Sequence, residues 1–141
     1  GDTFRWKSEN VSTNEVAEAL GVFDGVIQAN VYGVEVADYS GKAGMAALIV
    51  EEGGVDLAAL HAHVHKELPH YARPLFLRMH TETPEEHTTG TFKLKKTDLV
   101  KQGWDPASVD EPLYFDDPDT GAYVELTAEI RAAIQSGEKR V

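Results

Sequence analysis

The sequence predicts an α+β fold, in which a small mixed β-sheet with an N-terminal hairpin-like segment is packed against helices. Segments with strand-like and helix-like residue patterns alternate in the order strand, helix, strand, strand, helix, strand, helix. The chain has 141 residues, of which 42% are hydrophobic, and this is enough for the core of one globular domain. Since no internal repeat or long linker divides residues 1–141, we expect a single domain.

The first elements lie within the first 20 residues. Residues 3–11 alternate loosely between apolar and polar side chains, which is typical of a strand. They lead directly to Ser12, and Glu15 follows three residues later. A hydroxyl and a glutamate at this spacing can form a capping box, so the sequence predicts a helix over residues 13–20.

Two longer strands are expected next. Residues 27–36 are rich in β-branched and aromatic side chains, and residues 43–50 form a second such run. Between them, residues 37–42 contain Asp38 and Gly41, which favour a turn. This arrangement indicates an antiparallel hairpin.

A second helix and a third strand follow. Asp56 can cap a helix that ends at Pro69, because proline cannot continue it. Apolar residues recur in this segment at helical spacing, namely Leu57, Leu60, Val64 and Leu68. Pro74 then precedes the apolar run 75–77, which we interpret as a strand of the same sheet.

The last third of the chain is more polar. Residues 80–90 contain Pro84 and show no periodicity, so a loop is expected there, followed by a short helix from near Lys95 to Gly103. The acidic segment 105–119 is interpreted as a solvated wrap. Its expected aromatic anchors are Trp104, Tyr114 and Phe115. A final helix after Thr127 would bury one face, formed by Leu126, Ile130, Ala133 and Ile134.

Composition excludes several classes of function. With 24 acidic and 13 basic residues, the net charge of -11 repels nucleic-acid phosphates and anionic lipid headgroups, so neither is expected as a direct partner. The chain has no cysteine, which excludes disulfides and thiolate chemistry. No apolar run approaches the roughly 18 to 20 residues that a membrane-spanning helix needs.

Four lysines gather in one segment of this acidic chain. Residues 92–101 contain Lys93, Lys95, Lys96 and Lys101 but only one acidic residue. Lys93 follows Gly90 in a loop just before a predicted helix. From there, a lysine ammonium could reach a neighbouring domain and neutralise charge that develops on a phosphoryl group. The residue pattern is equally compatible with an ordinary solvated helix face.

A histidine cluster is the other group considered for chemistry. His61 and His65 are one helical turn apart and could chelate a metal together, with His63 and His70 nearby. However, no HExxH pattern is present, so we expect surface or half-buried histidines and no metal site. Arg73 is expected to hold the turn before Pro74 by pairing with a carboxylate.

Several strings of residues carry a resemblance to a known family. They are FRWKSENVST at 4–13, ANVYGV at 29–34, GMAA at 44–47, YARP at 71–74, TGTFK at 89–93 and PLYF at 112–115. In this order they resemble the C-terminal domain of the acyl-CoA synthetase, luciferase and peptide-synthetase adenylation superfamily. The residues of these motifs are similar to those of the fatty-acid-transport or very-long-chain acyl-CoA synthetase branch.

This resemblance implies an AMP-forming fatty acid:CoA ligase that uses ATP, Mg²⁺ and coenzyme A. A fatty acid and ATP would give an acyl-adenylate, and coenzyme A would then displace AMP. The partner of this lid domain would be an N-terminal domain of the same polypeptide that binds ATP and the fatty acid, so the chain alone is expected to be inactive. The resemblance makes Lys93 the catalytic group of the first step.

The resemblance also implies cofactor-binding residues in two places. They are Trp6, Lys7, Ser8, Glu9, Asn10 and Gly90. In the second step the backbone of residues 6–10 would line the channel for the pantetheine arm of coenzyme A. The family usually has glycine where this chain has Ser8, so a positive φ or a close approach would be less comfortable here. For Trp6, stacking on adenine and anchoring of the first strand both remain open.

Two alternatives to this function remain open. The chain could be a noncatalytic binding module that keeps the fold and recruits a partner through its acidic surface. It could also belong to a ligase of the same superfamily that acts on another carboxylic acid. The leading interpretation implies a cytoplasmic enzyme, whose full-length form is either free or peripheral to the inner face of the membrane.

Overall fold

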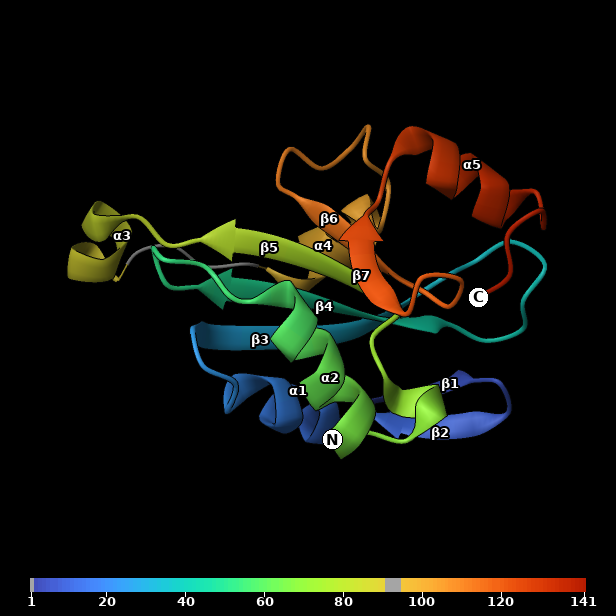
Figure 1. Cartoon of the computed structure of the whole chain (residues 1–141), viewed down its shortest axis with the longest axis horizontal. Coiled ribbons are helices and arrows are strands. Elements are labelled where there is room, and N and C mark those ends of the chain that lie inside the picture. The colour runs from blue at the N-terminus through green and yellow to red at the C-terminus, as the bar shows by residue number, and fades with distance from the viewer. Residues whose placement is uncertain (1, 91–94) are drawn as a thin grey trace.

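The α+β fold predicted from the sequence is confirmed. The structure is a computed structural model that describes residues 2–90 and 95–141 (Figure 1). Its main sheet has five strands in the order β3-β4-β5-β6-β7. Their bounds are Val26–Val34, Ala43–Val50, Phe76–Thr81, Leu113–Asp117 and Ala122–Glu125. Only β4 and β5 pair in parallel, so the sheet is mixed.

The predicted hairpin of β3 and β4 forms the first half of this sheet. The two strands pair antiparallel, from Val34 opposite Ala43 to Val26 opposite Val50. All residues of β4 are buried, as expected for a strand with a neighbour on each side and both faces covered. The parallel β5 returns after helix α2, because parallel neighbours need a long crossover connection.

The N-terminal segment forms its own two-stranded sheet. Strand β1 (Thr3–Trp6) pairs antiparallel with β2 (Glu9–Ser12), with Trp6 opposite Glu9. Only Lys7 and Ser8 connect them, so the expected hairpin-like segment is a tight hairpin. The interpretation of residues 3–11 as one strand was wrong, because the chain reverses at this two-residue turn. Ser12 ends β2 and caps the next helix by accepting a hydrogen bond from the Glu15 backbone N–H.

Within residues 2–90 and 95–141, five α-helices lie around the sheets. They are α1 (Thr13–Gly21), α2 (Leu57–Glu67), α3 (Pro84–Thr89), α4 (Lys96–Gln102) and α5 (Ala128–Gln135). Helices α1 and α2 lie side by side beneath the main sheet in Figure 1, with α1 packed on β3. Asp56 caps α2 and Gly103 ends α4, as predicted. None of the helices that the structure describes is long and apolar enough to cross a membrane.

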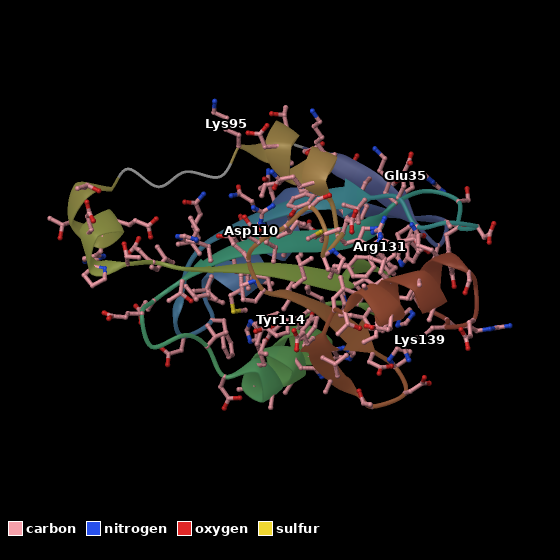
Figure 2. All side chains as sticks on the ribbon, turned by 90° about the horizontal axis from the view of Figure 1, so that it is seen from above. Glu35, Lys95, Asp110, Tyr114, Arg131 and Lys139 are labelled. Atoms are coloured by element: carbon pink, nitrogen blue, oxygen red, sulfur yellow. The ribbon has the colours of Figure 1, made fainter. Side chains whose placement is uncertain are left out.

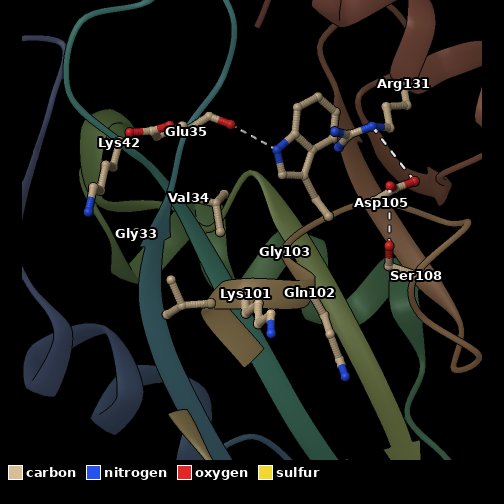
Figure 3. Close-up of a pocket in the computed structure, with 12 residues that line it drawn as sticks. Gly33, Val34, Glu35, Lys42, Lys101, Gln102, Gly103, Asp105, Ser108 and Arg131 are labelled. Carbon is tan, nitrogen blue, oxygen red and sulfur yellow. Dashed lines mark hydrogen bonds and ion pairs between the residues drawn. The ribbon is translucent and has the colours of Figure 1, made fainter. Parts of the chain in front are cut away.

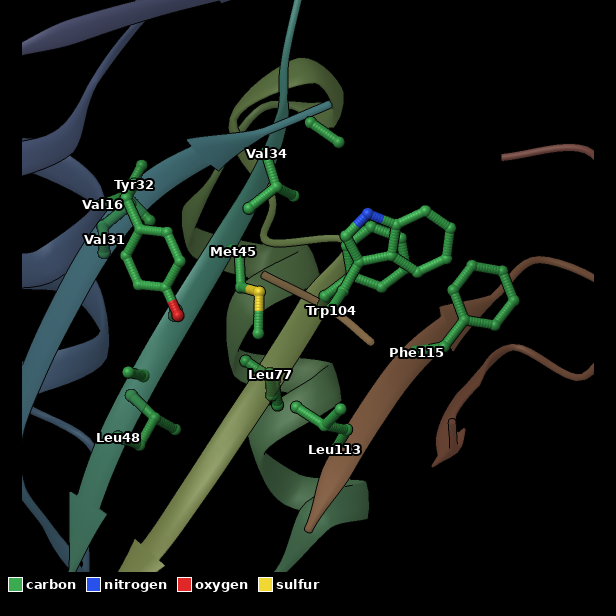
Figure 4. Close-up of a cluster of buried hydrophobic side chains, with 14 of the residues drawn as sticks. Val16, Val31, Tyr32, Val34, Met45, Leu48, Leu77, Trp104, Leu113 and Phe115 are labelled. Atoms are coloured by element: carbon green, nitrogen blue, oxygen red, sulfur yellow. The ribbon is translucent and has the colours of Figure 1, made fainter. Parts of the chain in front are cut away.

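Aromatic side chains fill the centre of the core (Figure 4). The rings of Phe76 and Trp104 stack with centroids 4.3 Å apart, and Phe115 lies 6.0 Å from Phe76. The Trp104 indole N–H donates to the Glu35 backbone oxygen at 2.9 Å, so its polar atom is satisfied despite burial. Trp104 and Phe115 therefore anchor the segment between them, as the sequence indicated.

Two expectations about the chain's last third were wrong. Part of the segment interpreted as a solvated wrap is strand β6, in which Leu113, Phe115 and Asp117 are buried alternately. Part of the expected loop at 80–90 is ordered as the end of β5 and as α3. Helix α3 forms because Thr83 and Glu86 make a reciprocal capping box and Pro84 occupies its first turn, where a missing N–H costs nothing.

Candidate functional site

The turn between β1 and β2 contains two of the predicted site residues in an unusual backbone conformation. Lys7 has φ 51° and Ser8 has φ 69°, so both central residues of this two-residue loop are left-handed. This is the pattern of a type I′ hairpin turn, which normally favours Asn-Gly. The sequence left two reasons open for which glycine would suit position 8, a positive φ or a close approach, and the structure shows the positive φ.

Arg5 stabilises this turn from the preceding strand. Its guanidinium donates to the Ser8 backbone oxygen at 2.9 Å and to the Asn10 side-chain oxygen at 3.2 Å. Glu9 and Asn10 are exposed. The amide oxygen of Asn10 is therefore directed to Arg5, and the turn keeps its shape despite lacking glycine.

Trp6 lies at the base of the hairpin and is buried, with 5% of its surface exposed. Its ring packs on Tyr39 with centroids 5.2 Å apart, which anchors the first strand. The backbone of Gly41 approaches closely here, since a Cβ at this glycine would lie 2.3 Å from the Arg5 oxygen. Lys42 N–H donates to the same Arg5 oxygen at 2.7 Å. The hairpin is thus fixed to the loop between β3 and β4.

Lys7 extends from the turn toward the end of the described chain. Its ammonium donates to the Val141 backbone oxygen at 3.0 Å and lies 5.7 Å from the Trp6 ring centroid. Sequence reasoning missed Tyr39, Gly41 and Val141 as supports of the hairpin. The pairing of Glu9 and Trp6 can be inferred locally, but these supports come from distant parts of the chain.

The second predicted location lies beyond α3. Gly90 ends this helix in the left-handed conformation, with φ 62° and ψ 23°, and its N–H donates to the Glu86 oxygen at 2.7 Å. Lys93, the expected catalytic residue, lies outside the described residues. The next described residue, Lys95, precedes α4 and points away from the ribbon (Figure 2). Lys96 pairs with Asp2 at 2.6 Å.

The structure does not bring these two locations together. In Figure 1, whose horizontal direction is the long axis of the molecule, α3 lies at one end and the β1–β2 hairpin lies toward the other. Trp6, Lys7, Ser8, Glu9 and Asn10 therefore form one candidate site, and Gly90 belongs to another. A single small ligand cannot contact both at once.

A pocket of about 340 Å³ lies elsewhere, between β3, α4 and α5 (Figure 3). Arg131 covers the Trp104 ring, with its guanidinium carbon 4.3 Å from the centroid, and it pairs with Asp105 at 3.8 Å. Lys42 and Lys101 also line this pocket. Of the predicted site residues that the structure describes, none lines it, so the pocket is not part of either candidate site.

The histidines of α2 are half-buried, as expected, but their partners were not foreseen. His61 and His65 both contact Asp116 of β6, at 2.8 Å and 2.7 Å. His63 bonds to the Ala19 oxygen of α1. Arg73 holds the turn after α2 through the backbone oxygens of Leu68 and His65, at 3.0 Å and 2.9 Å, and not through a carboxylate.

Comparison with known proteins gives one family match and several similar proteins. The family model described as AMP-binding enzyme C-terminal domain matches residues 15–93. Long-chain fatty acid transport protein 6 of Mus musculus is 50% identical over 142 residues, which is 100% of this chain and 22% of that protein. Long-chain fatty acid transport protein 3 of Homo sapiens is 45% identical, over 100% of this chain and 20% of that protein.

The chain therefore spans about one fifth of the length of these curated relatives. Among solved structures, a Mycobacterium tuberculosis fatty acyl CoA synthetase aligns with TM-score 0.56 and 21% identity, covering 72% of this chain and 19% of that one. This structural likeness supports the fold alone.

Proposed function

Because this chain belongs to the family of AMP-binding enzyme C-terminal domains, we propose that it is the lid domain of an AMP-forming fatty acid:CoA ligase. The observation that carries the proposal is the family match, since it extends from Glu15 to Lys93 and so includes the proposed catalytic residue. Identity of 50% along the whole chain to a protein named for long-chain fatty acid transport favours a long-chain acyl substrate.

In the first half-reaction, a fatty acid carboxylate attacks the α-phosphorus of ATP, and pyrophosphate leaves. Mg²⁺ and ATP would be held mainly by an N-terminal domain of the same polypeptide. Attack of an anion on a polyanion concentrates negative charge, which a positioned cation relieves. We assign this role to the ammonium of Lys93. Gly90 turns the chain sharply at the end of α3, three residues before this lysine.

In the second half-reaction, the sulfur of coenzyme A attacks the acyl carbonyl carbon and AMP leaves. We assign the lining of the pantetheine channel to the turn at Lys7 and Ser8, with Trp6, Glu9 and Asn10 beside it. The contacts of the hairpin support this assignment. Arg5 bonds to the Ser8 oxygen, the Gly41 backbone packs closely on Arg5, and the Trp6 ring packs on Tyr39. A braced backbone can approach a substrate without reordering.

The two half-reactions would use opposite ends of the domain, since the hairpin and Gly90 lie far apart along its long axis (Figure 1). The domain would therefore have to reorient on its partner domain between the steps. In the whole protein the partner is the N-terminal domain, and the enzyme would act in the cytoplasm or at the inner face of the membrane.

The test is Lys93→Ala in the full-length polypeptide, with each half-reaction measured separately. Acyl-adenylate formation should fall by about 10²- to 10³-fold, as for loss of a preorganised charge-stabilising donor. Thioester formation from supplied acyl-adenylate should be largely retained. Lys95→Ala is the matched control, because Lys95 is exposed and lies in the same basic segment, and it should leave both rates near wild type.

Equal loss of both half-reactions in Lys93→Ala would contradict the assigned role. The assays should span acyl chain lengths from short to very long. Turnover of no fatty acid by the wild-type enzyme would contradict the ligase proposal as a whole.

A further inference from the structure

Three side chains from two distant segments converge on one point at the junction of α2 and β6. Nε2 of His61 lies 2.8 Å from one carboxylate oxygen of Asp116, and Nε2 of His65 lies 2.7 Å from the other. One potential ligand atom from each residue falls within 4.8 Å of the others. The proposed acyl-CoA ligase function uses none of these three residues.

The histidine pair is arranged by the helix. Residues 61 and 65 are one turn apart on α2, so their side chains leave the same face, and their rings stack with centroids 4.0 Å apart. Tyr123 packs edge-on against the His61 ring, with centroids 5.3 Å apart, and its hydroxyl donates to the Pro74 oxygen. The His61 ring is therefore held between His65 and Tyr123.

Burial separates this group from an ordinary surface cluster. The side chains of His61 and Asp116 are each 13% exposed, and that of His65 is 34% exposed. Solvent screens a half-buried carboxylate less than an exposed one, which strengthens its attraction for a cation. His65 and Asp116 also border a cavity of about 100 Å³, which leaves room for a water molecule as a further ligand.

The donor set fits one class of metal. Two neutral imidazoles and one carboxylate offer two nitrogen ligands and one oxygen ligand, which is the set that Zn²⁺ and similar transition metals prefer. Binding needs both Nε2 lone pairs free, so the proton of each ring would move to Nδ1. The cations nearest the cavity are already occupied, since Lys7 donates to the Val141 oxygen and Arg73 to two oxygens.

We propose that His61, His65 and Asp116 form a binding site for Zn²⁺ or a similar divalent transition metal, which ties helix α2 to strand β6. None of the three proposed ligands is assigned a role in the proposed ligase reaction, although the cavity beside them is also lined by Trp6 and Lys7 of the hairpin. If the chain bound no metal, the proposed ligase function would still stand. If the ligase function were contradicted, the proposed metal site would still stand. The metal would act on stability, because it binds the folded arrangement and not the unfolded chain.

The experiment is titration of the 141-residue chain with Co²⁺, followed by the visible d–d absorption of the bound ion, and then displacement with Zn²⁺. Asp116→Asn keeps the size of the side chain, and His65→Ala removes one nitrogen. Since loss of groups that only orient a ligand costs 10- to 100-fold in affinity, either change should weaken binding by about 100-fold or more. His63→Ala, on the same helix but bonded to Ala19, should bind within about twofold of wild type.

Zn²⁺ should also raise the melting temperature of the wild type and of His63→Ala, but not that of Asp116→Asn. Far-UV circular dichroism establishes that each variant is folded, and Asp116→Asn decides the question if His65→Ala does not fold. The proposal is overturned if the wild type shows no d–d band at saturating Co²⁺. It is equally overturned if Asp116→Asn binds Co²⁺ as tightly as the wild type.

Discussion

At the scale of single residues, the turn at Lys7 and Ser8 is the feature on which the candidate site depends. Both residues adopt positive φ although both carry a Cβ, and each such residue costs about 1 kcal/mol relative to glycine. The Arg5 hydrogen bond to the Ser8 oxygen and the bracing of Trp6 by Tyr39 offset this cost. The strain is therefore retained at the position where the proposed channel needs a close backbone approach.

Replacement of Ser8 by glycine measures this strain. Ser8→Gly should have a free energy of unfolding about 1 kcal/mol higher than Ser8→Ala, because alanine keeps the Cβ and the unfavourable left-handed conformation. Urea denaturation of the two variants gives the difference directly. Equal stabilities would mean that the backbone at position 8 is not strained by its side chain.

The residues of the candidate site were only partly predictable. The resemblance pointed to Trp6 to Asn10 and left open whether glycine would suit position 8 through a positive φ or through a close approach. Tyr39, Gly41 and Asp116 were not identified as partners. Each lies more than 30 residues from the group it contacts, so only the tertiary fold reveals the contact.

At the scale of elements, α3 shows how a short exposed helix can depend on its caps. It has no buried residue, so packing contributes little to it. The Glu86 carboxylate accepts a hydrogen bond from the Thr83 backbone N–H at 2.9 Å and another from His80 at 2.9 Å. The backbone bond from Thr83, and next the bond from His80, hold the pKa of Glu86 below its ordinary value.

Acidification should therefore loosen α3. Since the pKa of Glu86 is lower in the folded state, its contribution to stability is present above the ordinary value of 4.5 and is lost as the pH falls through the folded-state value. Secondary chemical shifts of residues 84–89, recorded by NMR from pH 7 to pH 3, should show helix loss at the acidic end. Glu86→Gln keeps the cap but cannot titrate, so its helix content should not change over this pH range. The same loss of helix at acidic pH in Glu86→Gln as in the wild type would contradict the explanation.

The elements that were predicted correctly are those with local signals. Ser12 and Asp56 cap helices within three residues of their partners, and β4 is a continuous apolar run. The sequence of α3 also carried such a signal at Thr83 and Glu86, which the presence of Pro84 obscured. Strand β6 is different, because its stability depends on contacts with distant residues. Asp117 forms an ion pair with Lys139 at 3.0 Å, and the strand pairs with β5 and β7 on either side.

At the scale of the whole molecule, the domain has two proposed functional ends joined by a buried centre. The buried strand β4 and the aromatic group around Phe76 form this centre (Figure 4). The hairpin with Ser8 lies toward one end, and Gly90, which precedes Lys93 in sequence, lies at the other (Figure 1). If the domain presents one end to its partner domain in each half-reaction, changes at the two ends must affect different chemical steps.

The most direct test of this claim compares Ser8→Arg with Lys93→Ala in the full-length polypeptide, measuring both half-reactions for each. Arginine adds bulk at the turn, while the free-energy cost of the left-handed backbone conformation is about the same as for serine. Ser8→Arg should therefore slow thioester formation and leave acyl-adenylate formation near wild type. Lys93→Ala should do the opposite. This crossed pattern is the result that two separate ends predict, and slowing of the same half-reaction by both substitutions would contradict it.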